Sequence, residues 1–126
     1  MSRSHFKGRF SCKYRDKYHG NADRIIWRSS WERLFMMYCD KHPHVLEWSS
    51  EEIIIPYLYN REERSYYPDF WIRMIDSTGR IVEKIIEIKP AYQKSWQQNR
   101  AKWVEARRYC DKHGFDFLVL TEEGLF

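Results

Sequence analysis

The sequence predicts a small α/β domain in which a mixed sheet is flanked by helices and preceded by a basic N-terminal arm. Its 126 residues suffice for one domain. With 43% hydrophobic and 17% aromatic residues, the composition excludes a disordered chain. Helical periodicity and short β-branched runs follow one another in the order arm, helix, three strands, helix, strand.

No apolar run is long enough to span a bilayer, so a transmembrane protein is excluded. Residues 1–7 lack the apolar core of a signal peptide, and we therefore expect a protein that is not secreted. The three cysteines, Cys12, Cys39 and Cys110, have no close spacing, which excludes a zinc knuckle and a CxxC redox pair and fits a reducing compartment. We interpret His42 and His44 as part of a loop and not as a metal site, because an isolated HxH pair is weak evidence for zinc.

The arm is expected to cover residues 1–28, ahead of a domain formed by residues 29–126. Residues 1–30 hold eight basic and two acidic side chains, whereas the remaining 96 residues hold 14 basic and 16 acidic ones. A basic arm on a nearly neutral body suits contact with a polyanion. Charge alone leaves a second interpretation open, namely a solvated extension.

The first helix is expected to begin after Ser29, because Ser29 and Glu32 form a capping-box pattern. It should end before His42 and Pro43, since proline disfavours helical conformation in the residue before it. An apolar face at helical spacing is formed by Trp31, Leu34, Phe35 and Tyr38.

Three strands are predicted to follow, and they cover residues 52–57, 66–75 and 81–89. Residues 60–64 are expected to form a charged turn, and residues 76–80 the turn of a hairpin. A second helix is predicted over 97–113, because Gly114 is a typical residue just beyond a helix end. The last strand, 115–120, is nearly all apolar, so we expect burial on both of its faces.

The predicted hairpin brings two carboxylates together. If residues 76–80 form its turn, Ile75 lies opposite Ile81, and Asp69 lies opposite Glu87. Two carboxylates in directly opposite positions are destabilising without a counterion. Lys89 projects from the same face as Glu87, while the side chains expected to build the core on the other face are Phe70, Ile72, Ile86 and Ile88.

Two close carboxylates suit a hard divalent cation such as Mg²⁺. Such an ion polarises a phosphoryl oxygen and lowers the pKa of bound water. Lys89 is placed to stabilise the negative charge that develops during phosphate chemistry. The alternative is a surface carboxylate pair whose charge is offset by Lys89 and Arg73.

These residues resemble the signature of the PD-(D/E)xK nuclease superfamily, through the segments Tyr67-Pro68-Asp69-Phe70 and Glu87-Ile88-Lys89. The order of the predicted elements is similar to the restriction-endonuclease-like αβββαβ core of that superfamily. Two groups resemble the chain more closely between residues 28 and about 123. They are the N-terminal domains of TnsA endonucleases and the head completion nucleases of T-even-type phages.

The resemblance implies DNA hydrolysis that depends on Mg²⁺, with Mn²⁺ as a substitute. Asp69 and Glu87 would be metal ligands, Lys89 the catalytic lysine, and Glu32 a further acid at the metal site, although the capping box already accounts for Glu32. TnsA relatives can carry glutamine where this chain has Glu87. The cations for which we predict DNA contact are Arg9, Lys13, Arg15, Lys17, Arg28 and Lys94.

The small size of the chain favours the phage relatives over the TnsA proteins. We therefore expect a nuclease that acts on packaged DNA before heads join tails, in the host cytoplasm or the virion, with phage portal or neck proteins as further partners. The alternatives are a TnsA-like nuclease that cleaves transposon ends and a non-catalytic DNA-binding virion assembly protein. The intact set of Asp69, Glu87 and Lys89 argues against the non-catalytic alternative.

Overall fold

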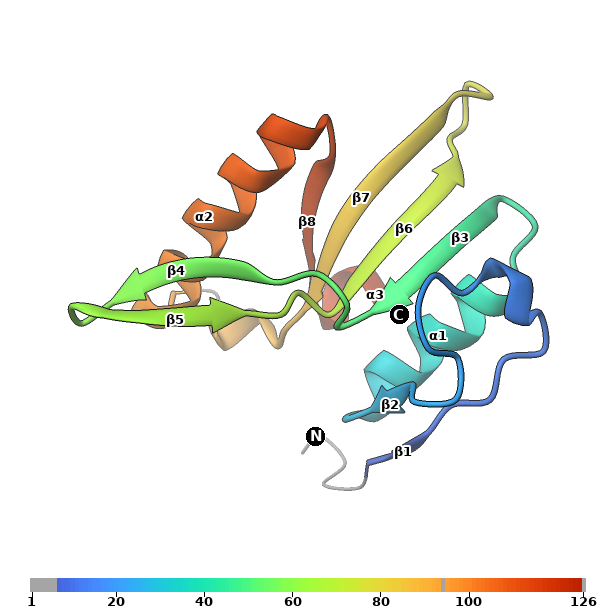
Figure 1. Cartoon of the computed structure of the whole chain (residues 1–126), viewed down its shortest axis with the longest axis horizontal. Helices are drawn as coiled ribbons and strands as arrows, with labels where there is room; N and C mark the ends of the chain where they lie inside the picture. The colour runs from blue at the N-terminus through green and yellow to red at the C-terminus, as the bar shows by residue number, and fades with distance from the viewer. Residues whose placement is uncertain (1–6, 94, 126) are drawn as a thin grey trace.

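The computed structural model describes residues 7–93 and 95–125 of the chain. Its centre is a four-stranded sheet in the order β3–β6–β7–β8, formed by Val45–Ser50, Phe70–Ile75, Ile81–Ile88 and Asp116–Leu120 (Figure 1). Strands β3, β6 and β7 are antiparallel neighbours, and β8 runs parallel to β7.

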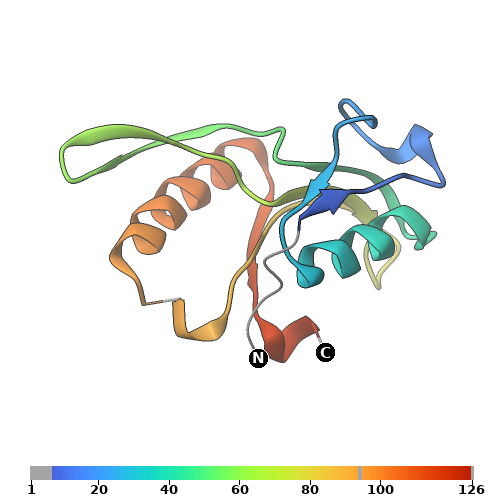
Figure 2. The ribbon, with the colours of Figure 1, turned by 90° about the horizontal axis from the view of Figure 1, so that it is seen from below.

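Two helices flank this sheet, with the central strands between them (Figure 2). They are α1, Ser30–Lys41, and α2, Gln97–His113. The order α1, β3, β6, β7, α2, β8 is the predicted αβββαβ order, so the predicted fold class is confirmed. A short helix, α3 (Glu122–Leu125), follows β8. No helix in the described ranges has the length and apolar character that crossing a membrane requires.

Helix α1 begins and ends where the sequence predicts. The Ser29 side chain accepts a hydrogen bond from the Glu32 N–H at 3.2 Å, and the last helical residue is Lys41. The predicted apolar face is wrong in part, because Leu34 and Tyr38 are 46% and 39% exposed. The helix is rotated so that residues 7–28 and β3 cover another stripe, which consists of Trp31, Glu32, Phe35, Met36, Cys39 and Asp40.

The hairpin of β6 and β7 has the predicted register. Ile75 pairs with Ile81, and Phe70 pairs with Ile86. The turn is closed by Asp76, whose Oδ1 accepts hydrogen bonds from two backbone N–H groups of the same turn. The even-numbered side chains predicted for the core are buried together with those of α1, and they are Phe70, Ile72, Ile86 and Ile88.

Strand β3 completes the sheet at a place that the sequence analysis missed. It pairs Trp48 with Ile72 and Ser50 with Phe70. The prediction that residues 52–57 form a strand of this sheet is wrong. Strand β4 (Ile55–Tyr59) instead pairs with β5 (Glu62–Tyr66) in a separate hairpin, so most of the predicted turn at 60–64 is strand.

The hairpin of β4 and β5 extends away from the sheet and lies along α2 (Figure 1). Its inner side chains form a second core cluster with α2, made of Ile55, Tyr57, Tyr66, Trp103 and Ala106. Helix α2 ends at Gly114, which has the left-handed conformation that the sequence predicts. Strand β8 is an edge strand with Leu118 38% exposed, so the prediction of burial on both faces is wrong.

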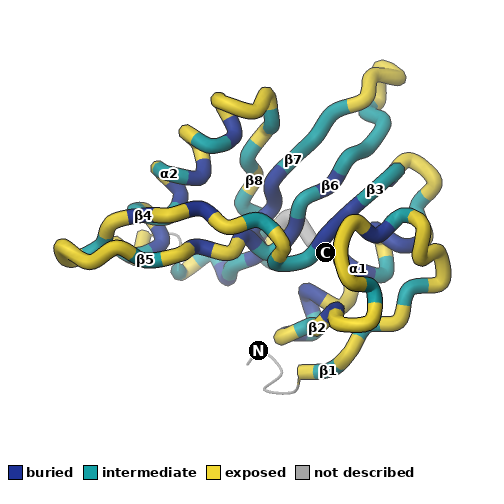
Figure 3. The backbone as a smooth tube through the Cα atoms, in the orientation of Figure 1, coloured by how far each residue is buried: buried dark blue, intermediate teal, exposed yellow. Residues whose placement is uncertain are grey.

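Residues 7–28 hold little regular structure, as predicted, with β1 at Gly8–Arg9, a short 3₁₀ turn at Arg15–Lys17 and β2 at Ile26–Trp27. The segment nevertheless packs against the domain, because Tyr18 and Ile25 are buried in the cluster beneath α1. Figure 3 shows that exposed and buried stretches alternate along this N-terminal segment.

Candidate active site

Two carboxylates meet where three strands converge. Asp69 precedes β6, and Glu87 lies near the end of β7. The Asp69 N–H donates to Glu87 Oε1 at 3.3 Å, and the Ile88 N–H donates to Asp69 Oδ2 at 2.7 Å. The Glu51 N–H, just beyond β3, donates to the Asp69 carbonyl at 3.2 Å. Backbone N–H groups from two neighbouring segments and the Glu87 carboxylate therefore hold Asp69, and the predicted juxtaposition of Asp69 and Glu87 is present.

The pair is electrostatically unfavourable without a cation. Glu87 is only 2% exposed, and Asp69 is half-buried. Burial raises the pKa of Asp69 well above the usual carboxyl range, and the negative charge of Glu87 adds to the rise. The Ile88 N–H and the positive charge of Lys89 act against it. A cation placed between the two carboxylates would remove this repulsion.

Lys89 follows directly after β7, two residues beyond Glu87. Its N–H donates to the Leu120 carbonyl at 2.9 Å, so the backbone of β8 holds it in place. The effect of its charge on Asp69 places the ammonium group within electrostatic reach of the carboxylate pair. The structure thus brings together three of the four predicted catalytic residues, Asp69, Glu87 and Lys89.

The Tyr66 hydroxyl is a polar group near this pair that the sequence analysis missed. It is buried, and its polar neighbours are the Glu87 carboxylate and Nε1 of Trp103, although no well-aligned hydrogen bond joins the described groups. Burial raises the pKa of Tyr66, and the charges of Glu87 and Asp69 raise it further, so the phenol stays protonated and can donate. Because buried polar groups are nearly always hydrogen-bonded, the expected partners of this hydroxyl are Glu87, Trp103 or a water molecule.

The chemistry of these groups fits a hard divalent cation. Asp69 and Glu87 offer the oxygen ligands that Mg²⁺ prefers, and Tyr66 can donate to one of the waters that Mg²⁺ usually keeps. Among residues 7–93 and 95–125, no three His, Cys, Asp or Glu side chains gather closely enough to hold a metal ion. The two carboxylates would therefore share the ion with water or substrate.

Glu32, the fourth predicted catalytic residue, serves as the capping residue of α1. It is 6% exposed, its Oε1 accepts from the Arg28 N–H at 3.1 Å, and its Oε2 accepts from Ser29 Oγ at 3.5 Å. It does not form a three-carboxylate group with Asp69 and Glu87. A role for Glu32 at the metal site stays a prediction.

The cations predicted to contact DNA are held in different ways. Lys17 donates to the carbonyls of Asp40 and His42 at 3.0 and 2.9 Å, which satisfies the C-terminal end of α1. Arg15 pairs with Asp23 at 3.0 Å on the surface. Arg9 and Lys13 are exposed, Arg28 pairs with Glu51, and Lys94 lies outside the described residues.

The site also contains Glu51, which sequence reasoning missed. The dipeptide Glu51-Glu52 follows two serines, a composition typical of solvated loops, and only the structure shows that Glu51 contacts Asp69. Tyr66 was assigned to the strand of Asp69, whereas it ends β5. Its aromatic side chain next to the Tyr-Pro-Asp segment is the one signal that could have indicated its place.

Two comparisons with known proteins match the chain to nucleases. A family model for the TnsA-like endonuclease N-terminal domain matches residues 42–122. The head completion nuclease of Enterobacteria phage T4 is 33% identical over 144 aligned positions, which cover 95% of this chain and 93% of that protein. The span of the family match contains Asp69, Glu87 and Lys89, and it leaves out Arg28 and Glu32.

Proposed function

Because the chain belongs to the family of TnsA-like endonuclease N-terminal domains and is a nuclease, we propose that it hydrolyses DNA phosphodiester bonds with Mg²⁺, or Mn²⁺ as a substitute, held by Asp69 and Glu87. The observation that carries this proposal is the pair of carboxylates, each of which accepts a hydrogen bond from the backbone of the segment that carries the other. The pKa of Asp69 is raised, as is expected when two carboxylates that bind a cation have none between them.

Each residue of the site has a distinct task. Asp69 and Glu87 bind the ion, which supplies a polarised phosphoryl oxygen and a water of lowered pKa. Lys89 stabilises the negative charge that develops on the phosphate. Glu32 reaches the site through water, and Tyr66 orients a water or a phosphate oxygen with its buried hydroxyl.

The proposal is tested by relaxation of supercoiled plasmid DNA in Mg²⁺, with and without EDTA. Lys89→Ala should slow cleavage about 100-fold or more, because it removes a group that stabilises the transition state. The matched control is Lys84→Ala, which removes another lysine of β7 and should cleave like the wild type. Cleavage that persists in EDTA, or equal rates for the two variants, would refute the proposal.

The head completion nuclease of phage T4 supports a more specific role. We infer that the chain acts on packaged DNA in filled heads before tails attach, in the host cytoplasm or the virion, and that portal or neck proteins are its partners. Filled heads assembled without the nuclease should acquire tails when wild-type protein is added, and not when Lys89→Ala is added, as counted by electron microscopy. Equal numbers of tailed particles would contradict a role for cleavage in this step.

The match to the TnsA-like family favours a second candidate, a nuclease that cleaves transposon ends. The genes beside the coding sequence discriminate between the two. Portal and neck genes are expected for the phage role, and transposase genes for the transposon role.

A further inference from the structure

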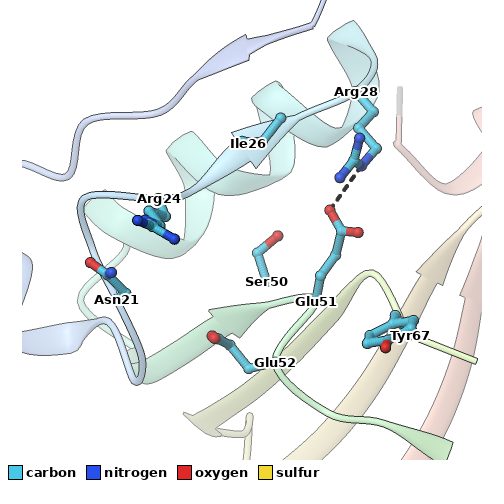
Figure 4. Close-up of a pocket in the computed structure, with 8 residues that line it drawn as sticks. All are labelled: Asn21, Arg24, Ile26, Arg28, Ser50, Glu51, Glu52 and Tyr67. Atoms are coloured by element: carbon cyan, nitrogen blue, oxygen red, sulfur yellow. Dashed lines mark hydrogen bonds and ion pairs between the residues drawn. The ribbon is translucent and has the colours of Figure 1, made fainter.

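A hollow of about 500 Å³ lies between the segment around β2 and the chain that leaves β3 (Figure 4). One wall comes from the segment around β2 and carries Arg24 and Arg28, and the opposite wall comes from the chain leaving β3. The full lining consists of Asn21, Arg24, Ile26, Arg28, Ser50, Glu51, Glu52 and Tyr67. No residue of this hollow belongs to the four predicted catalytic residues, yet its walls are continuous with the backbone that holds them.

Glu51 connects the hollow to the active site. Its φ of 56° lies in the left-handed region, which is uncommon for a residue with a side chain and is often found at functional sites. In this conformation the Glu51 N–H donates to the Asp69 carbonyl while its carboxylate pairs with Arg28 Nε at 3.0 Å. One residue therefore contacts both the metal-binding segment and the arginine across the hollow.

The ion pair between Arg28 and Glu51 is weak enough for a ligand to replace Glu51 as the partner of Arg28. The two side chains are 50% and 31% exposed, and an ion pair this accessible to water is weak. A phosphate can accept two parallel hydrogen bonds from a guanidinium group, whereas Glu51 accepts one from Arg28, through Nε. Arg24 forms no ion pair with any described residue, so its charge is available to the same ligand.

Tyr67 supplies an aromatic surface at the side of the hollow. It is 48% exposed, although its neighbours Tyr66 and Pro68 are buried. Its buried neighbours hold the backbone of Tyr67 in place, while its ring is exposed to solvent. Tyr67 lies two residues before Asp69 in the chain. Exposed aromatic rings beside cations are the groups on which nucleic-acid bases stack.

We propose that this hollow is a nucleotide subsite next to the cleavage site. A DNA phosphate replaces Glu51 as the partner of Arg28, and the attached base packs on the Tyr67 ring. The inference rests on the proposed function, since it takes DNA as the substrate. Glu51 then acts as a positioning residue that keeps Arg28 over the empty hollow and releases it when a strand enters.

The test measures the affinity of a short single-stranded DNA by fluorescence anisotropy in EDTA, where no cleavage occurs. Glu51→Gln should bind about fivefold more tightly than the wild type, because the competing charge is gone. The control, Glu62→Gln, removes another solvent-accessible ion pair, with Arg64 on the hairpin of β4 and β5, and should leave affinity unchanged. If the two variants bind alike, the subsite is refuted.

Two further variants test the other contacts. Arg28→Ala should bind about tenfold more weakly and should reduce the slope of log K against log salt by about 0.7. Tyr67→Ala should also bind about tenfold more weakly, whereas Tyr67→Phe keeps the ring and should bind like the wild type. Wild-type affinity in Arg28→Ala, or equal affinities for the two Tyr67 variants, would refute the subsite.

The binding assay separates this inference from the proposed function. Absence of metal-dependent cleavage in the wild type, with affinity that still depends on Arg28 and Glu51, refutes the proposed function and supports the subsite. Normal cleavage with affinities that none of these variants alters refutes the subsite alone.

Discussion

The carboxylate pair and the nucleotide subsite lie side by side but are built from different kinds of structure. Asp69 immediately precedes the central strand β6 and Glu87 lies in the central strand β7, and hydrogen bonds with backbone N–H groups of Glu51, Asp69 and Ile88 hold them. Arg28 and Tyr67 lie on connecting segments, and within the described part of the chain the Arg28 side chain is held by an exposed ion pair with Glu51. The difference indicates a division in which the sheet fixes the groups that need accurate geometry, while the connections carry groups that must change partners.

The largest expected effect is in the rigid region. Asp69→Asn should lower the rate of plasmid cleavage about 100-fold or more, because it removes a metal ligand. The same variant should raise the Tm of the metal-free protein, since it removes a buried charge next to Glu87. Thermal unfolding in EDTA checks the second effect. A lower Tm together with lost cleavage would indicate a folding defect instead of a missing ligand.

The pH dependence provides the next test. Asp69 must lose its proton to bind a cation, so cleavage at fixed Mg²⁺ should rise with pH, about tenfold per unit, until the raised pKa of Asp69 is passed. The metal-free protein should instead lose stability as pH rises from the ordinary carboxyl pKa to the raised one, because the folded state binds the proton more tightly. More Mg²⁺ should move the cleavage profile to lower pH, and a profile that does not move would contradict competition between proton and metal.

Glu32 has two predicted roles, capping of α1 and assistance at the metal site, and the next variant separates them. Glu32→Gln keeps the capping box, which accepts either residue, so Tm should stay unchanged. Cleavage should fall about tenfold if the carboxylate assists at the metal site. Ser29→Ala is the opposite control, because it removes the N-cap, costs about 1 kcal/mol of stability and leaves the carboxylate. Unchanged cleavage in Glu32→Gln would limit Glu32 to capping.

The smallest effects are expected in the arm. Arg9 is exposed, and Arg9→Ala should weaken DNA binding only about twofold. Lys17 satisfies carbonyls at the end of α1, so Lys17→Met should lower stability by about 1 kcal/mol and leave the affinity for DNA unchanged. Anisotropy and thermal unfolding measure the two quantities. A loss of affinity in Lys17→Met larger than that in Arg9→Ala would contradict this assignment.

Much of the rigid region could be predicted from the sequence, because local signals define it. The turn at 76–80 fixes the register of β6 and β7, and this register places Asp69 opposite Glu87. Ser29 and Glu32 define the start of α1, and Gly114 defines the end of α2. These features depend on residues close together in the chain.

The parts that could not be predicted depend on long-range packing. Strand β3 lacks a β-branched run, whereas residues 53–55 have one and form part of a separate segment, so the wrong strand was assigned to the sheet. The subsite requires the β2 segment to pack opposite Glu51, and nothing in either segment predicts that meeting. Tyr66 could be identified as a site residue only once β5 was separated from β6.

The central claim is that Asp69 and Glu87 hold a divalent cation, and binding of Mn²⁺ followed by electron paramagnetic resonance tests it most directly. The wild type should bind Mn²⁺, Asp69→Asn should bind it about 10- to 100-fold more weakly, and Lys84→Ala should bind it like the wild type. Mg²⁺ should displace the bound Mn²⁺. Equal Mn²⁺ affinity in the wild type and in Asp69→Asn would contradict the claim.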